Sequence, residues 1–155
     1  MRIWFVLMLS CGGATVAPPA EHASAPASPA AQCIATADAK RERRPDEPQK
    51  VTVKHVLVKW AGAKRAPKEI TRTREEACLR ALEARSKLEK GASFADVVAE
   101  YSEEPGAATR EGMLGTIERT QAEPAFADAA FELHVGEVSY VVESGFGFHV
   151  IMRTE

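Results

Sequence analysis

The uneven distribution of proline separates the part of this chain that can fold from the part that cannot. Six of the nine prolines fall within residues 12–50, among eleven alanines and almost no large apolar side chains. Proline removes a backbone donor and interrupts helices. A segment so poor in large apolar groups buries too little surface to offset the entropy lost on ordering. We therefore expect a disordered linker over residues 12–50 and one folded unit over residues 51–155.

Within that linker we expect the charged residues and one cysteine to be exposed. The basic residues between positions 40 and 44 are interleaved with acidic ones, which favours a solvated stretch over a binding patch. Cys33 is also expected to be exposed, with redox pairing to Cys78 as the alternative. Three scattered cysteines without C-x-x-C spacing predict neither a disulfide framework nor a zinc site. We expect no metal and no cofactor.

Residues 1–11 have the order of an export signal. A single early positive charge is followed by an apolar run and then by Ser10 and Cys11. The run is far shorter than the roughly 18–20 residues that span a bilayer. The segment resembles a bacterial lipoprotein signal, which implies lipidation of Cys11 and a location in the cell envelope, anchored to a membrane. The alternative is a frayed apolar N-terminus with an incidental cysteine, and then a cytoplasmic protein.

Residues 51–155 alternate between strand and helix patterns. A β-branched, alternating run predicts a strand over 51–60. Capping pairs open two predicted helices, over 73–90 and 93–101. The remaining predicted elements are strands at 113–117, 138–142 and 148–152 and a helix at 124–131. This order predicts an α+β fold, with a small, mostly antiparallel four-stranded sheet packed against three or four helices.

The charge of the folded unit excludes one class of partner. Residues 51–155 carry 14 basic and 17 acidic side chains, a net charge of −3. Generic nucleic-acid binders and polybasic membrane binders need a basic excess. We therefore expect no nucleic-acid partner.

Short motifs along residues 51–155 occur in an order that resembles the parvulin-type peptidyl-prolyl cis/trans isomerase domain. The motifs are His55-Val56-Leu57-Val58-Lys59, Gly112-Met113-Leu114-Gly115, Ala130-Phe131-Glu132-Leu133 and Gly147-Phe148-His149-Val150-Ile151. The resemblance implies a parvulin/FKBP-like fold and a monomer that isomerises X–Pro bonds in polypeptides without covalent catalysis. Details such as the basic loop after the first strand resemble the phosphate-specific branch of the family.

The resemblance also implies which polar residues act at the site. His55 and His149 match a hydrogen-bonded histidine pair on neighbouring strands. Glu104 matches the Asp or Cys beside the isomerising bond, and Ser144 matches a hydroxyl that joins the histidine network. The alternatives are satisfied core histidines, a solvated loop carboxylate and a turn serine.

Four further positions match the pocket for the proline ring. Leu114 and Phe126 match its apolar lining, Phe146 matches an aromatic near the last strand, and Ala122 stands where the family has Met. The smaller Ala122 implies a wider, less apolar pocket. Simple core packing is the alternative for all four.

Lys59, Lys64 and Arg65 match the basic residues that hold a phosphate before proline, and a solvated basic loop is the alternative. Lys and Arg suit such an anion, which for an exported protein would more naturally be Asp or Glu. Two other functions would use the same groove without turnover. One is a chaperone-like binder of unfolded chains, and the other is a docking module for phosphate or acidic motifs.

Overall fold

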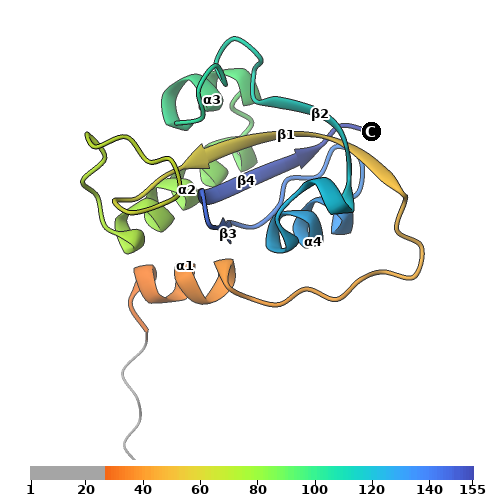
Figure 1. The fold of residues 1–155 in the computed structure, drawn as a ribbon, viewed down its shortest axis with the longest axis horizontal. Coiled ribbons are helices and arrows are strands. Elements are labelled where there is room, and N and C mark those ends of the chain that lie inside the picture. The colour runs from red at the N-terminus through yellow and green to blue at the C-terminus, as the bar shows by residue number, and fades with distance from the viewer. Residues whose placement is uncertain (1–26) are drawn as a thin grey trace, which may run out of the picture.

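The computed structural model describes residues 27–155 (Figure 1). Residues 1–26, which contain the predicted signal and Cys11, lie outside the described part. The helices are α1 (Pro29–Ala37), α2 (Arg74–Glu89), α3 (Phe94–Tyr101), the short 3-10 helix η1 (Arg119–Gln121) and α4 (Pro124–Glu132). The strands are β1 (Lys50–Val58), β2 (Met113–Glu118), β3 (Val142–Ser144) and β4 (Gly147–Arg153). None of the helices within residues 27–155 has the length and apolar character needed to cross a membrane.

The predicted α+β class is confirmed. The four strands form one sheet in the order β2-β1-β4-β3, and every neighbouring pair is antiparallel. Each face of the sheet has its own apolar core. Val56 of β1 and Val150 of β4 pack with α2 and α3, whereas Val53 and Ile151 pack with α4. Because side chains two residues apart share a face, His55 lies on the α4 side of the sheet.

The predicted helix starts are confirmed by their caps. The Thr73 hydroxyl accepts from the Glu76 backbone N–H at 3.2 Å, and the Glu76 carboxylate accepts from the Thr73 N–H at 2.7 Å. Ser93 accepts from the Asp96 N–H at the start of α3. Pro124 occupies the first turn of α4, where its missing N–H costs nothing.

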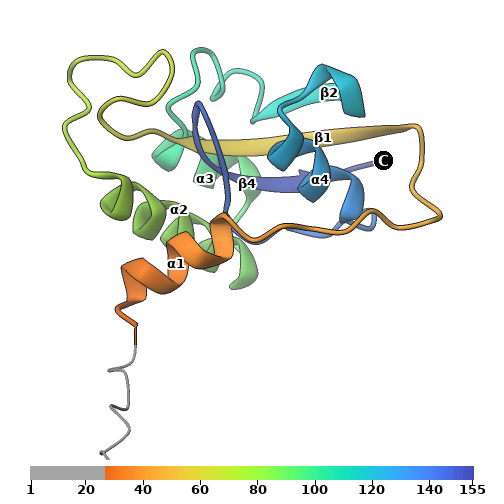
Figure 2. The same ribbon diagram turned by 60° about the horizontal axis from the view of Figure 1, so that its bottom comes forward.

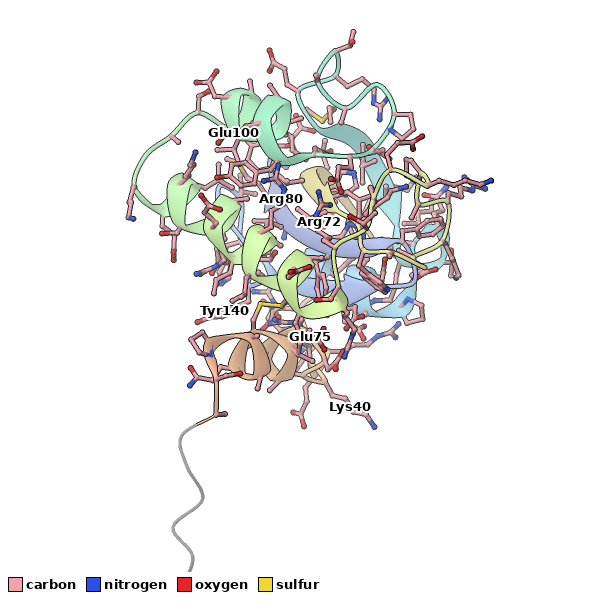
Figure 3. All side chains as sticks on the ribbon, turned by 90° about the vertical axis from the view of Figure 1, so that its left-hand side faces the viewer. Lys40, Arg72, Glu75, Arg80, Glu100 and Tyr140 are labelled. Carbon is pink, nitrogen blue, oxygen red and sulfur yellow. A yellow bond between two sulfur atoms is a disulfide. The ribbon has the colours of Figure 1, made fainter. Side chains whose placement is uncertain are left out.

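The expectation of a disordered linker is wrong for residues 29–37, which form α1. The Ser28 hydroxyl accepts from the Ala31 N–H, and Pro29 sits in the first turn, where proline favours a helix. Cys33 is buried, not exposed, and forms a disulfide with Cys78 of α2. The alternative pairing is therefore confirmed, and Figure 3 shows this bridge between the two helices.

The segment that connects α1 to β1 (residues 38–49) packs along α4 (Figure 2). Arg41 pairs with Glu132 at 2.8 Å, and Glu47 pairs with Arg119. Arg44 donates to the backbone carbonyl of Phe131 at 3.4 Å. The expectation of a solvated basic stretch is therefore wrong for Arg41 and Arg44, because partners distant in sequence engage both guanidinium groups.

The third strand begins later than predicted. It covers Val142–Ser144 rather than residues 138–142, of which Val138 makes only an isolated bridge with Met152. The Ser139 hydroxyl accepts from the Ile151 N–H at 2.9 Å. A side-chain oxygen thereby takes a donor that a regular strand ladder would pair with a carbonyl.

Candidate active site

Two buried histidines meet in the middle of the sheet. In the register of β1 and β4, His55 lies opposite Ile151 and His149 lies opposite Leu57, so the two histidines are diagonal neighbours on one face. Their Nδ1 atoms are 3.1 Å apart, and the rings are stacked with centroids 5.3 Å apart. The expected histidine pair is thus present in the geometry.

Hydrogen bonds extend from the histidine pair in both directions. The Ser144 hydroxyl lies 2.7 Å from His149 Nε2 and also accepts from the Phe146 N–H. At the other end, His55 Nε2 lies 3.0 Å from a carboxylate oxygen of Glu104. Arg110 donates to that same oxygen at 2.9 Å. The result is one continuous hydrogen-bond series from the β3–β4 turn to the loop after α3.

The surroundings of Glu104 and His149 determine the charge state of each group. The hydrogen bond from His55, reinforced by Arg110, holds the pKa of Glu104 below its usual value although burial opposes the shift. Burial, with help from His55 and Lys59, places the pKa of His149 well below its usual value. Near neutral pH, Glu104 is therefore an acceptor and His149 is neutral.

A consistent set of donors follows from these charge states. Because the Glu104 carboxylate only accepts, His55 Nε2 must donate to it. Between the two imidazoles one Nδ1 donates and the other accepts, and His149 Nε2 shares a hydrogen bond with the Ser144 hydroxyl. Every ring nitrogen of the pair therefore has a partner, as buried polar groups require.

A cavity of about 490 Å³ opens above the histidines on the α4 side of the sheet. The predicted polar residues that line it are His55, Glu104, Ser144 and His149. The predicted apolar residues that line it are Leu114, Ala122, Phe126 and Phe146. Phe126 of α4 lies edge-on to both imidazoles, with ring centroids 5.7 and 5.0 Å away. The cavity thus joins an apolar hollow to a fully hydrogen-bonded polar floor.

Gly112 keeps the two sides of this cavity in place. Its φ is +75°, and a Cβ at this position would lie 2.5 Å from the backbone oxygen of His55. The Gly112 carbonyl accepts from the His55 N–H at 2.9 Å. Only glycine allows the backbone at position 112 to come this close to His55. This contact places the start of β2, and therefore Leu114, beside His55 of β1.

The sequence profile of the rotamase family, described as a PPIC-type PPIase domain, matches residues 55–155. The chain belongs to the parvulin family of PPIC-type peptidyl-prolyl isomerases. This parvulin chain is 40% identical over 113 residues to the putative peptidyl-prolyl cis-trans isomerase dodo of Drosophila melanogaster. The matched region covers 70% of this chain and 68% of dodo. It is also 40% identical over 75 residues to the foldase protein PrsA of Geobacillus kaustophilus. That match covers 48% of this chain but only 27% of PrsA.

The solved structures agree with the family assignment. The parvulin chain superposes on the peptidyl-prolyl isomerase ESS1 from Candida albicans with a TM-score of 0.63 and 30% identity. The match covers 74% of this chain and 66% of that one. The peptidyl-prolyl isomerase character expected from the sequence motifs is therefore confirmed at the level of the family.

The predicted basic residues of the parvulin domain lie in three different environments. Lys59 is buried, lines the cavity and donates from its ammonium to the Arg65 carbonyl at 2.9 Å. Arg65 also lines the cavity, and its guanidinium lies 5.7 Å from the centroid of Phe146. Lys64 lies outside the cavity lining and pairs with Glu123 at 2.7 Å. These residues therefore do not form one exposed cluster of three equivalent cations.

Several cavity residues of the parvulin domain lie outside the set that the sequence predicts. Leu57 follows from His55, because the two lie two residues apart on one strand face. No comparable signal points to Glu123, which meets the backbone of Gly145 only through the fold. The other lining residues outside the prediction are Pro105, Ile117 and Gln121.

Proposed function

We propose that this parvulin domain accelerates rotation about X–Pro bonds by holding the prolyl ring in the cavity, with no covalent step. The substrates are proline-containing polypeptides. The observation that carries the proposal is that Leu114 and Phe126 share one cavity with the hydrogen-bonded pair of His55 and His149.

The reaction needs an environment rather than a nucleophile. The barrier to amide rotation is about 18–20 kcal/mol because the planar peptide bond is stabilised by resonance. In the half-rotated state that resonance is lost, and less negative charge resides on the carbonyl oxygen. A hollow that is apolar around the ring and poor in water favours this state over the planar ones. Catalysis is then stronger binding of the twisted conformer.

The histidine pair acts, in this proposal, as the rigid floor of the hollow. Phe126 packs its ring against both imidazoles, and Ser144 and Glu104 hold the two imidazoles at their outer nitrogens. His55, His149 and Ser144 would orient the floor. Glu104, which lies beside the entrance with its side chain 25% exposed, would contact the rotating bond.

We further propose that the cavity favours an anionic residue before proline. Arg65 supports this, because its guanidinium lies at the cavity and no carboxylate within residues 27–155 is within 4 Å of it. Guanidinium groups bind carboxylates and phosphates through charge-assisted hydrogen bonds. The anion is phosphorylated Ser or Thr, or Asp or Glu.

The location that we propose is the bacterial cell envelope, with a lipid anchor at Cys11. The Cys33–Cys78 disulfide supports export, because disulfides persist in oxidising compartments and are rare in the cytosol. Replacing Cys11 with Ser should move the protein from the membrane to the soluble fraction. Unchanged fractionation would remove the anchor from the proposal.

NMR exchange measurements with the full chain test the activity. The peptides carry Ala-Pro, Glu-Pro or phosphoSer-Pro. We expect faster cis/trans exchange on all three, and the fastest on the two anionic peptides. No acceleration on any peptide would overturn the isomerase proposal. Binding without acceleration would then favour the chaperone-like or docking alternatives.

A further inference from the structure

Glu123, at the start of α4, ties together two other walls of the cavity. One of its carboxylate oxygens accepts from the Lys64 ammonium at 2.7 Å, in the loop after β1. The other oxygen accepts from the backbone N–H of Gly145 at 2.7 Å, in the turn between β3 and β4. Glu123 itself lines the cavity.

The surroundings of Lys64 hold this ion pair in one place. The Lys64 backbone N–H donates to the Gly145 carbonyl at 2.8 Å, and its ammonium lies 5.3 Å from the centroid of the Phe146 ring. A Cβ on Gly145 would lie 2.8 Å from the Lys64 ammonium, so the absence of a side chain there makes room for the lysine. The hydrogen bonds from Lys64 and Gly145 lower the pKa of Glu123, which is ionised at neutral pH.

Lys64 and Arg65 are the two cations beside Phe146, here called the rim cations. They differ in whether they are free to bind an anion from a substrate. Lys64 is neutralised by a carboxylate of the chain itself, whereas Arg65 has no such partner within residues 27–155. Both lie against Phe146, so an anionic side chain bound at that rim would meet Arg65 directly. It would reach Lys64 only by displacing Glu123.

We propose that Glu123 is a specificity-determining residue, an internal anion that occupies Lys64 and weakens the preference of the cavity for a negative charge before proline. The inference rests on the proposed function, because it assumes that X–Pro segments bind in this cavity.

The test compares two peptides that differ only in Glu-Pro or Gln-Pro. The measured quantity is the ratio of kcat/KM for Glu-Pro to that for Gln-Pro, in the full chain and in Glu123→Gln. Glutamine keeps an oxygen for the Gly145 N–H and removes the charge. We expect the ratio to rise by about two- to fivefold, the range typical of one exposed ion pair. A phosphoSer-Pro peptide should show a larger rise.

A matched control and a double variant keep the test sharp. Glu100 of α3 pairs with Lys87 at the same 2.7 Å but does not line the cavity, so Glu100→Gln should leave the ratio unchanged. Adding Lys64→Gln to Glu123→Gln should cancel the gain. A rise that survives without Lys64, or no rise in Glu123→Gln, would overturn the proposal.

The outcome is separable from that of the proposed function. If the wild-type chain accelerates neither peptide, the isomerase proposal fails before Glu123 is tested. If it accelerates both and Glu123→Gln leaves the ratio unchanged, only the role of Glu123 fails. If Glu123→Gln unfolds, the single variant Lys64→Gln tests the proposal instead. A lysine that Glu123 already neutralises contributes little to anion binding, so the ratio of kcat/KM for Glu-Pro to that for Gln-Pro should stay within about twofold of wild type. A larger fall would contradict the proposal.

Discussion

His55 and His149 place their Nδ1 atoms 3.1 Å apart, although 94 residues separate them in the chain. Neither imidazole is open to solvent, and each outer nitrogen already has a partner. The pair is therefore a fixed part of the cavity floor, and the properties expected of the domain can be tested around it.

The first prediction concerns the apolar side of the cavity. Leu114 is 38% exposed at the cavity, and Leu79 of α2 is 37% exposed outside it. Leu114→Ala removes apolar surface from the cavity that we propose holds the prolyl ring, so kcat/KM on an Ala-Pro peptide should fall by about tenfold. Leu79→Ala should leave kcat/KM unchanged, and both variants should unfold at similar temperatures. Equal activity in the two variants would show that Leu114 does not contact the ring.

The second prediction concerns pH. The pKa of buried His149 lies below its usual value of 6.5. As pH falls below about 6.5, the unfolded chain takes up a proton at this histidine while the folded chain does not. The free energy of unfolding should therefore fall with decreasing pH by up to about 1.4 kcal/mol per pH unit, until the folded pKa is reached.

Denaturant titrations between pH 7 and pH 5 check this slope. This window lies above the range in which Glu104 and Glu123, with their lowered pKa values, begin to contribute. His149→Gln should flatten the slope, whatever its effect on stability at pH 7. A slope unaffected by His149→Gln would contradict the buried, neutral state of this imidazole.

The third prediction concerns the disulfide. The bond between Cys33 and Cys78 closes a loop across a sequence separation of 45 residues. Replacing both cysteines with Ser should lower the free energy of unfolding by about 2–4 kcal/mol, because the unfolded chain is no longer constrained. Activity on short peptides should not change, since neither cysteine lines the cavity. A reductant should destabilise wild type but leave the double variant unaffected; equal sensitivity would contradict the bridge.

The fourth prediction concerns the two rim cations. Arg65→Gln should lower the ratio of kcat/KM for Glu-Pro to that for Gln-Pro by about threefold. Lys64→Gln should lower it less, because Glu123 already neutralises this lysine. High salt should reduce the difference between Arg65→Gln and wild type. The reverse order of the two variants would assign the anion preference to Lys64.

Local sequence signals were sufficient for most of the fold. The caps at Thr73 and Ser93 and the alternation through β1 each depend on residues within a few positions of one another. The proline content of residues 12–50 predicts no helix there, because proline interrupts helices, whereas Pro29 lies in the first turn of α1, where it is favourable. The position of proline within the helix, and not the proline content of the segment, decides whether a helix forms there.

No local sequence pattern predicts the contacts of residues 38–49 or the burial and partners of the basic residues. Arg41 meets Glu132 across 91 positions, and Glu123 meets Gly145 across 22. The sequence predicts that Lys59 binds an anion, with a solvated basic loop as the alternative, yet the fold buries Lys59 and its ammonium donates to the Arg65 carbonyl. Pairings of this kind depend on how the sheet and α4 come together.

The disulfide also determines how mechanical load enters the molecule. It joins α1 directly to α2, and the chain between the two cysteines contains β1, the strand that pairs with both β2 and β4. A pull on the N-terminal side of α1 therefore passes through the covalent bridge into α2 and bypasses β1. Tension from an attachment point upstream of α1 would leave the strand that carries His55 unstretched.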